Sequence, residues 1–343
     1  MNTLRNFLRI LRLTTMRTKF ITPLFLIFNI LCFSALAQKD FTNKSQAKNE
    51  LKNGIKEGKW VEYIDNRDSI TTDTAAPFYK LTVYKSGKPF GIMREYTRKG
   101  ILYIKIPYSD GKENGDAILY YDDGVVEEDI PCTDGKRNGV GRTYYISGAL
   151  KSETSYADGK KNGPEKEYYE NGKLKGECPY KYNKKEGIDK IYGENGILRG
   201  ECLYINDKKD GVEKLYYANG TVDMEISYKS NSKNGVEKEY YQSGVLKSET
   251  PYKDGIMNGV ENEYYGSGKL KSKSPYTAGL LNGVQKEYYQ DGKLSREFSC
   301  TNGRSNGVEK DYYESGVLMS MTTYTGGVAT KTTNYDENGN EIK

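Results

Sequence analysis

Hydrophobic and polar residues return in a fixed order along most of the chain, with a constant period. The stretch "NGVEKEYYQSGVLKSETPYKDG" over residues 234–255 is one copy. Aligned on Gly235, the equivalent glycines are Gly91, Gly115, Gly139, Gly163, Gly187, Gly211, Gly259, Gly283 and Gly307, each 24 residues from the next. Ten units without an insertion indicate a repeat array.

Each unit predicts two strands separated by turns. With the leading glycine counted as position 0, a second glycine stands at position 9, from Gly100 to Gly316. Position 20 holds glycine or one of Asn183, Asp207 and Asn231, the residue types that best tolerate a positive φ. The runs between these turns have the composition of strands. We therefore expect an all-β fold, an elongated single-layer antiparallel meander of 24-residue β-hairpin repeats.

Strand alternation assigns residues to two faces. Position 5 is Tyr in every unit, position 11 is Leu or Val, and position 17 is Tyr except at Cys132 and Cys300. Simple alternation places these positions on one face with the Val at position 1, and we predict that this face is the structural one. Proline recurs at position 16, which predicts a bulge or an interruption of pairing there. Such a bulge would shift the alternation by one residue near position 17.

The second Tyr of each pair, at position 6, falls on the opposite face beside Glu237, Glu239, Lys247 and Glu249. A solvated polar face is the simpler interpretation, and a recognition surface is the alternative. The candidate partner-binding ladder consists of Tyr121, Tyr145, Tyr169, Tyr217, Tyr241, Tyr265, Tyr289 and Tyr313.

The ends of the chain depart from the repeat and divide it into segments. "GKWVEYID" from Gly58 and "LTVYKSG" up to Gly87 resemble a first and a second strand with an enlarged turn between them. The expected segments are a signal peptide at 1–37, a linker at 38–50, a degenerate repeat with an insertion at 51–90, ten repeats at 91–330 and a truncated repeat at 331–343.

The first 37 residues carry Arg5, Arg9, Arg12, Arg17 and Lys19, no acidic residue, and an apolar run that ends in "ALA". This pattern is typical of a signal peptide and predicts export to the periplasm, the cell surface or the medium. Met16 is an alternative start, and an uncleaved membrane anchor is an alternative role for the apolar run.

Removing this segment changes the charge balance. Of 52 Lys and Arg residues five lie in it, so 47 remain against 47 Asp and Glu. A mature chain with zero net charge and interleaved signs does not support nucleic-acid binding, which needs clustered basic residues.

Cys178 and Cys202 both occupy position 15 of neighbouring units, so one strand separates them. Two strand spacings amount to about 9 to 10 Å, beyond the reach of a disulfide. Cys132 and Cys300 lie seven units apart. We therefore expect no disulfide among these four cysteines.

The composition offers few groups for chemistry. Histidine is absent, which excludes Ser/His/Asp and Cys/His nucleophiles and His-based zinc sites. Carboxylate pairs such as Glu237 and Glu239 recur in unit after unit, whereas a catalytic pair should interrupt the pattern once. No phosphate-binding loop or calcium loop is found. We expect no catalytic, cofactor or metal site and no enzymatic activity.

The spaced pattern of Leu246–Glu249, Tyr252, Gly255, Gly259, Tyr264 and Gly268 resembles the MORN repeat family, and more closely its bacterial YwqK-like variant. The resemblance covers residues 51–343 and implies a scaffolding role, with antitoxin-like function reported for the bacterial variants. MORN units usually place Trp where this chain has Tyr at position 17.

Three classes of function follow from these observations. The first is an exported, non-catalytic scaffold that binds a protein partner through its sheet. The second is a cell-wall or glycan-binding array, since tyrosines on short hairpins can stack on sugars, although the chain has a single Trp60. The third is an antitoxin-like protein, which the signal peptide does not favour, or a lipid-headgroup-binding protein, which the neutral mature chain does not favour.

Overall fold

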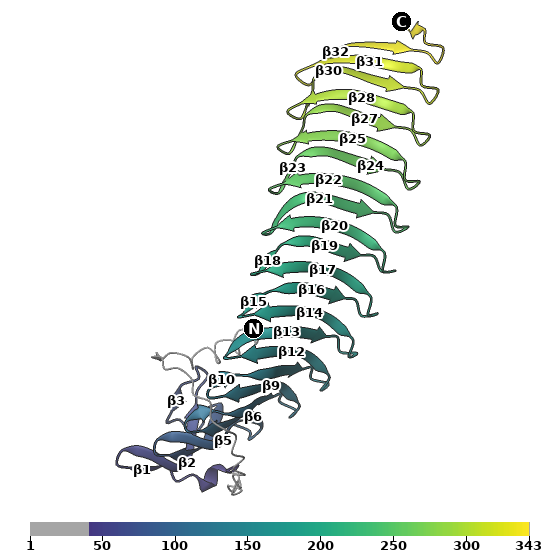
Figure 1. The fold of residues 1–343 in the computed structure, drawn as a ribbon. Coiled ribbons are helices and arrows are strands. Elements are labelled where there is room, and N and C mark those ends of the chain that lie inside the picture. The colour runs from purple at the N-terminus through teal and green to yellow at the C-terminus, as the bar shows by residue number, and fades with distance from the viewer. Residues whose placement is uncertain (1–40, 343) are drawn as a thin grey trace, which may run out of the picture. The chain divides into compact units, whose positions relative to one another are not determined.

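The computed structural model describes residues 41–342, so the predicted signal peptide lies outside the described residues. The described chain is one long open antiparallel sheet built from successive hairpins, which confirms the predicted fold class (Figure 1). No helix in this part of the chain is long and apolar enough to cross a membrane.

The sheet begins with elements that precede the regular repeats. They are the 3-10 helix η2 (Lys44–Gln46) and the strands β1 (Glu50–Lys52), β2 (Ile55–Ile64), β3 (Ile70–Thr71), β4 (Phe78–Lys85) and β5 (Lys88–Thr97). β5 is also the first strand of the unit that starts at Gly91.

In most later units the first strand is divided at the residue before the leading glycine. The divided strands are β7 (Lys112–Glu113) with β8 (Gly115–Tyr120), β10 (Lys136–Arg137) with β11 (Gly139–Tyr144), β15 (Lys184–Lys185) with β16 (Gly187–Tyr192), β18 (Lys208–Lys209) with β19 (Gly211–Tyr216), β23 (Ile256–Met257) with β24 (Gly259–Tyr264), β26 (Leu280–Leu281) with β27 (Gly283–Tyr288), and β29 (Arg304–Ser305) with β30 (Gly307–Tyr312). The undivided ones are β13 (Lys160–Tyr168) and β21 (Ser232–Tyr240).

The second strand of each unit runs without a break. These strands are β6 (Leu102–Ser109), β9 (Val126–Thr133), β12 (Leu150–Ala157), β14 (Leu174–Lys181), β17 (Leu198–Ile205), β20 (Val222–Lys229), β22 (Leu246–Lys253), β25 (Leu270–Thr277), β28 (Leu294–Thr301) and β31 (Leu318–Thr325). The strands β32 (Val328–Tyr335) and β33 (Glu341–Ile342) complete the sheet.

Pairing follows the order of the chain. In the unit of Gly235, Gly235 pairs with Tyr252 and Lys238 with Glu249. The next unit then pairs with the same strand from its other side, for example Ser248 with Glu263. Every second strand is therefore hydrogen-bonded on both sides, and the units stack through backbone pairing.

A bulge in the hairpin of each of the ten repeats corrects the predicted faces. Tyr240 pairs with Leu246 while Glu239 pairs with Ser248, so Lys247 is an extra residue on β22. The extra residue shifts the second strand by one, because alternation has a period of two. Tyr252 therefore shares a face with Glu237 and not with Tyr240, so the prediction for position 17 was wrong.

The predicted interruption of pairing at position 16 is confirmed on the side of the next unit, where Pro251 lies between the residues paired with β24 and those paired with β23. On the other side Pro251 is in register with Val236, so the predicted shift of alternation does not arise here. Pro251 has no amide hydrogen to donate, and its carbonyl accepts from the backbone N–H of Asn258 at 2.9 Å. Opposite it, Gly259 has a φ of 129°, and a Cβ there would lie 2.7 Å from Cγ of Pro251. A residue without a side chain is therefore needed at Gly259 to accommodate the ring of Pro251.

The turns at position 20 also behave as predicted. Asn183, Asp207 and Asn231 have φ values of 70°, 67° and 72°. Each side-chain Oδ1 accepts a hydrogen bond from a backbone N–H of the preceding unit, as Asn183 does from Lys161 at 2.7 Å. These substitutions for glycine therefore add a link between units.

The segment predicted to be a linker lies in part against the sheet. Phe41 is 3% exposed and packs with Leu81 and Tyr96. The side chain of Asn49 bonds both the N–H and the carbonyl of Val61, at 2.8 and 3.0 Å. These contacts cover one face and the outer edge of β2.

Within the degenerate repeat, Gly58 pairs with Tyr84, as positions 0 and 17 do elsewhere.

Cys132, Cys178, Cys202 and Cys300 are free and buried. This confirms that no disulfide forms among the cysteines of the described residues. Further along the chain, Ile226, Thr250 and Thr322 are buried at position 15. The buried row of the repeats therefore runs along position 15. It lies on the face opposite positions 1, 5 and 11, so the prediction that the face of those positions is the structural one was wrong for the regular repeats.

Candidate functional site

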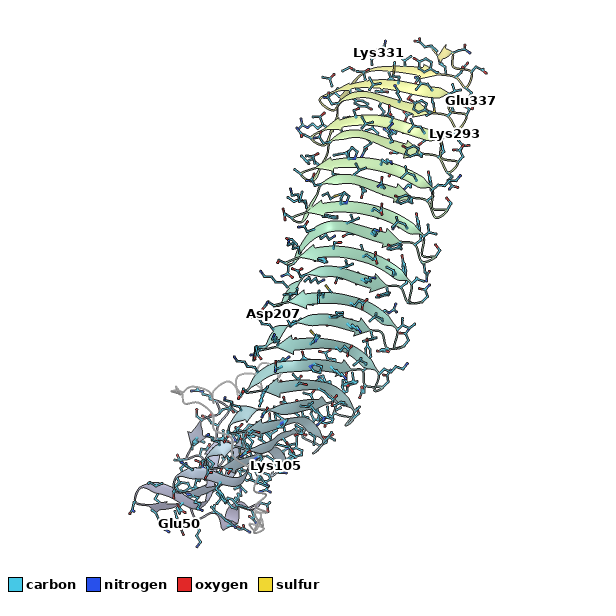
Figure 2. All side chains as sticks on the ribbon, viewed as in Figure 1. Glu50, Lys105, Asp207, Lys293, Lys331 and Glu337 are labelled. Carbon is cyan, nitrogen blue, oxygen red and sulfur yellow. The ribbon has the colours of Figure 1, made fainter. Side chains whose placement is uncertain are left out.

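The two faces of the repeats differ in chemistry. We call the face that carries positions 2, 4, 13, 15, 17 and 22 the groove face, and the face that carries positions 1, 3, 5, 14 and 16 the outer face. The turns lie along opposite sides of the sheet, as the labelled Asp207 and Lys293 show (Figure 2). Side chains of both faces extend along the whole array.

On the outer face the first Tyr of four units bonds a carboxylate of the preceding unit; these are Tyr168, Tyr216, Tyr240 and Tyr264. Tyr216 Oη donates to Glu201 at 2.8 Å and Tyr240 Oη to Glu225 at 3.1 Å. Burial and the Glu201 carboxylate raise the pKa of Tyr216 to about 12. These phenols therefore stay protonated and link neighbouring units.

A row of branched apolar side chains at position 1 lies exposed on the same face. Between 37% and 49% of each residue is exposed, and the members are Val140, Ile188, Val212, Val236, Val260, Val284 and Val308. Pro251 and Pro275 lie beside this row in the neighbouring strands. We call these residues the apolar stripe.

The candidate ladder at position 6 is half-buried along its length. Each hydroxyl donates to the backbone carbonyl of residue 5 in the next unit, or of Tyr335 at the end, over 2.5 to 2.9 Å. These phenols are therefore not freely solvated, because the loops place them within reach of the next strand. Whether the ladder binds a partner stays a prediction.

A row of alternating rings and ammonium groups runs along one side of the groove face. Lys185 Nζ lies 4.9 Å from the ring centre of Tyr204, and Lys209 lies 5.0 Å from that of Tyr228. Each Lys also pairs with the acid four residues later, as Lys185 does with Asp189 at 2.6 Å. The same arrangement holds for Lys161 and Lys233. These four lysines occupy the space between successive Tyr rings.

The row changes character after residue 233. The next equivalent positions hold Met257, Leu281 and Ser305. There a groove opens on this face, lined in one unit by Glu237, Glu239, Tyr241, Lys247, Ser248, Thr250 and Tyr252 and in the next by Glu261, Glu263, Tyr265, Lys271, Ser272, Ser274 and Tyr276. The sequence analysis did not predict this groove, because it used only the features that the units share. The signal that could have indicated the groove is the change at position 22 from Lys to Met, Leu and Ser.

The opposite end of the row holds Glu113 and Cys132. Burial raises the pKa of Glu113, and burial with the neighbouring Glu113 raises the pKa of the Cys132 thiol to about 11. Burial likewise raises the pKa of Cys178 and Cys202 to about 11. Thiols held in the neutral form are poor nucleophiles. Within residues 41–342 no group of three or more Cys, Asp and Glu side chains is placed to hold a metal ion.

Comparison with known families supports the repeat assignment. Six segments match the model described as MORN repeat variant: residues 161–182, 209–230, 233–254, 257–278, 281–299 and 305–325. Each begins two residues before a leading glycine and covers one hairpin. These six hairpins are similar to units of the MORN repeat variant. The unit of Gly187, whose second Tyr is replaced by Gly193, is not among the matches.

Other comparisons add little. No curated protein matches the chain. The crystal structures of TcdB2-TccC3-Cdc42 and TcdB2-TccC3 align at 12% identity, over 77% and 80% of this chain, with TM-scores of 0.13 and 0.14. The chain spans less than a fifth of the length of those chains, 18% and 19%. Similarity at this level supports no argument about function.

Proposed function

We propose that this chain is an exported, non-catalytic MORN-like scaffold that binds a protein partner through its extended sheet. Export rests on the signal-peptide pattern of residues 1–37. The antitoxin-like role implied by the family resemblance remains a weaker alternative, because that role belongs in the cytosol.

The apolar stripe is the observation that favours protein binding. Seven branched side chains on one face, each 37 to 49% exposed, recur at the spacing of the repeat. Pro251 and Pro275 extend the stripe beside Val236 and Val260, and exposed apolar surface of this kind marks interaction sites. Cross-strand ion pairs such as Lys238 with Glu249 at 3.7 Å lie beside the stripe and would form the polar rim of an interface.

The test is cross-linking of the tagged chain in its native cells, followed by capture with purified variants. Val236→Thr, Val260→Thr and Val284→Thr together keep β-branched residues on the strands and make the stripe polar. We expect this triple variant to lose the cross-linked partner while its circular dichroism is unchanged. Ile256→Thr with Leu280→Thr is the control, because these residues are equally exposed at the turns. Equal capture by both variants would show that the stripe does not bind the partner.

A further inference from the structure

The groove over the units of Gly235, Gly259 and Gly283 repeats its lining from one unit to the next. Glu239, Tyr241 and Lys247 in one unit correspond to Glu263, Tyr265 and Lys271 in the next. Equivalent residues are two strands apart, which corresponds to about 10 Å. A surface that presents the same groups at a constant spacing suits a linear polymer better than a small molecule.

The lining of the groove is polar and able both to donate and to accept hydrogen bonds. One segment presents the carboxylates of Glu261, Glu263 and Glu287, the ammonium group of Lys271, and the hydroxyls of Ser272, Ser274 and Ser295. Lys271 pairs with Glu263 at 3.0 Å, so their charges offset each other. Carboxylates outnumber ammonium groups along the groove, which disfavours an anionic ligand, and carboxylates accept hydrogen bonds from a neutral ligand rich in hydroxyl groups.

Tyrosine rings form both rims of this groove. Tyr265 stands on one side, and its hydroxyl is fixed to the carbonyl of Tyr288 at 2.6 Å. Tyr276 stands on the other side, beside Glu261, whose carboxylate adds to burial in raising the pKa of the phenol. Aromatic residues already held in place lose little side-chain entropy when a ligand packs against them.

The backbone argues against an extended polypeptide as the occupant. β22 pairs with β21 on one side and with β23 and β24 on the other, and β25 is paired on both sides in the same way. The groove floor therefore offers no free strand edge, which strand addition of a peptide requires. Its lining also lacks the apolar pockets that anchor peptide side chains.

We propose that this groove binds a neutral linear glycan, with Tyr241, Tyr265, Tyr252 and Tyr276 against the sugar rings and Glu261, Glu263 and Lys271 bonding their hydroxyls. The groove and the apolar stripe lie on different faces, so this site does not depend on the proposed protein interface. Met257 is part of the lining, at the position where Lys161, Lys185, Lys209 and Lys233 fill the same space in earlier units.

That difference supplies the test. Met257→Lys restores the earlier arrangement, because Glu261 follows four residues later as Glu237 follows Lys233. The variant should fold as the parent does and close the groove. Ile256→Lys is the matched control, since it adds the same charge at the neighbouring residue, which is half exposed at the turn.

The probes are soluble β-1,4-glucan, xylan and chitin oligosaccharides, with polygalacturonate as the charged comparison, measured by affinity electrophoresis and calorimetry on the mature chain. We expect at least one neutral glycan to bind the parent and Ile256→Lys equally, and Met257→Lys to bind it at least tenfold more weakly. Absence of binding to every neutral probe, or equal binding by the two variants, overturns the proposal. Loss in Met257→Lys of a protein partner, with no glycan bound, would identify the groove as a peptide site instead.

Discussion

The adjacent tyrosines at positions 5 and 6 are alike in exposure and different in what they bond. Tyr240 donates to the Glu225 carboxylate of the preceding unit, whereas Tyr241 donates to the Tyr264 carbonyl of the following one. This pair therefore links its unit in both directions. The sequence shows two adjacent tyrosines of the same type. Their roles differ because the two hydroxyl groups point towards different neighbouring units.

Tyr241→Phe should remove one hydrogen bond and leave a half-buried carbonyl with one partner fewer. The expected cost is about 1 kcal/mol, measured by urea denaturation. Thr97 occupies this position in the first repeat without such a phenol, so Thr97→Ser is a control that should change little. An unaltered free energy of unfolding in Tyr241→Phe would mean that water replaces the phenol at no cost.

Glu128 is a carboxylate whose environment opposes its charge. Burial raises its pKa above the ordinary value of 4.5, nearby Arg137 lowers it, and Glu127 raises it. The folded state thus binds the proton more tightly than the unfolded state, so this residue destabilises the fold at neutral pH. This destabilisation decreases as the pH falls below the raised pKa and is lost at about pH 4.5, the ordinary pKa of the unfolded state.

Glu128→Gln should therefore stabilise the protein at neutral pH and lose that advantage at pH values near 4.5. The comparison is the difference in urea midpoint between variant and parent at each pH. A constant difference across the range would show that the charge of Glu128 is not responsible.

At the scale of elements, the turns and the interrupted pairing at position 16 could be predicted, because Gly, Asn and Pro each have a characteristic backbone conformation. The bulge at position 12 could not, since Lys247 is an ordinary strand residue and nothing in its type demands an extra position. That single residue decides which face Tyr252 occupies. The groove could not be predicted for the same reason, because its rim requires Tyr252 and Tyr241 on one face and the bulge at position 12 places them there.

Two glycines allow the cost of backbone strain to be measured apart from the cost of a steric clash. Gly244 has a φ of 85° and a Cβ there would meet nothing within 4 Å, whereas one at Gly259 would meet Pro251 Cγ at 2.7 Å. Gly244→Ala should cost about 1 to 2 kcal/mol for the left-handed conformation alone. Gly259→Ala should cost about 1 to 3 kcal/mol more for the added overlap, measured by urea denaturation. Equal costs would mean that the proline ring moves aside freely.

At the scale of the whole described chain, each unit pairs only with its neighbours in sequence, so stability is close to a sum of unit and interface terms. The first units differ because Phe41 covers their outer face against Leu81 and Tyr96. Arg94 also donates to the Phe41 carbonyl at 3.4 Å. The outer face of the later units has no such cover in the part of the chain that the structure describes, which leaves the apolar stripe exposed.

Phe41→Ala should consequently destabilise the start of the array and leave its remainder intact. Truncating a buried aromatic costs about 3 to 5 kcal/mol. With contacts confined to neighbours, that loss should raise hydrogen exchange in β2, β4 and β5 and fade along the following strands. The β21–β24 hairpins, more than a hundred residues away, should exchange as in the parent protein. Uniformly faster exchange in all strands would instead mean that the array unfolds as one cooperative body, with Phe41 securing the whole sheet.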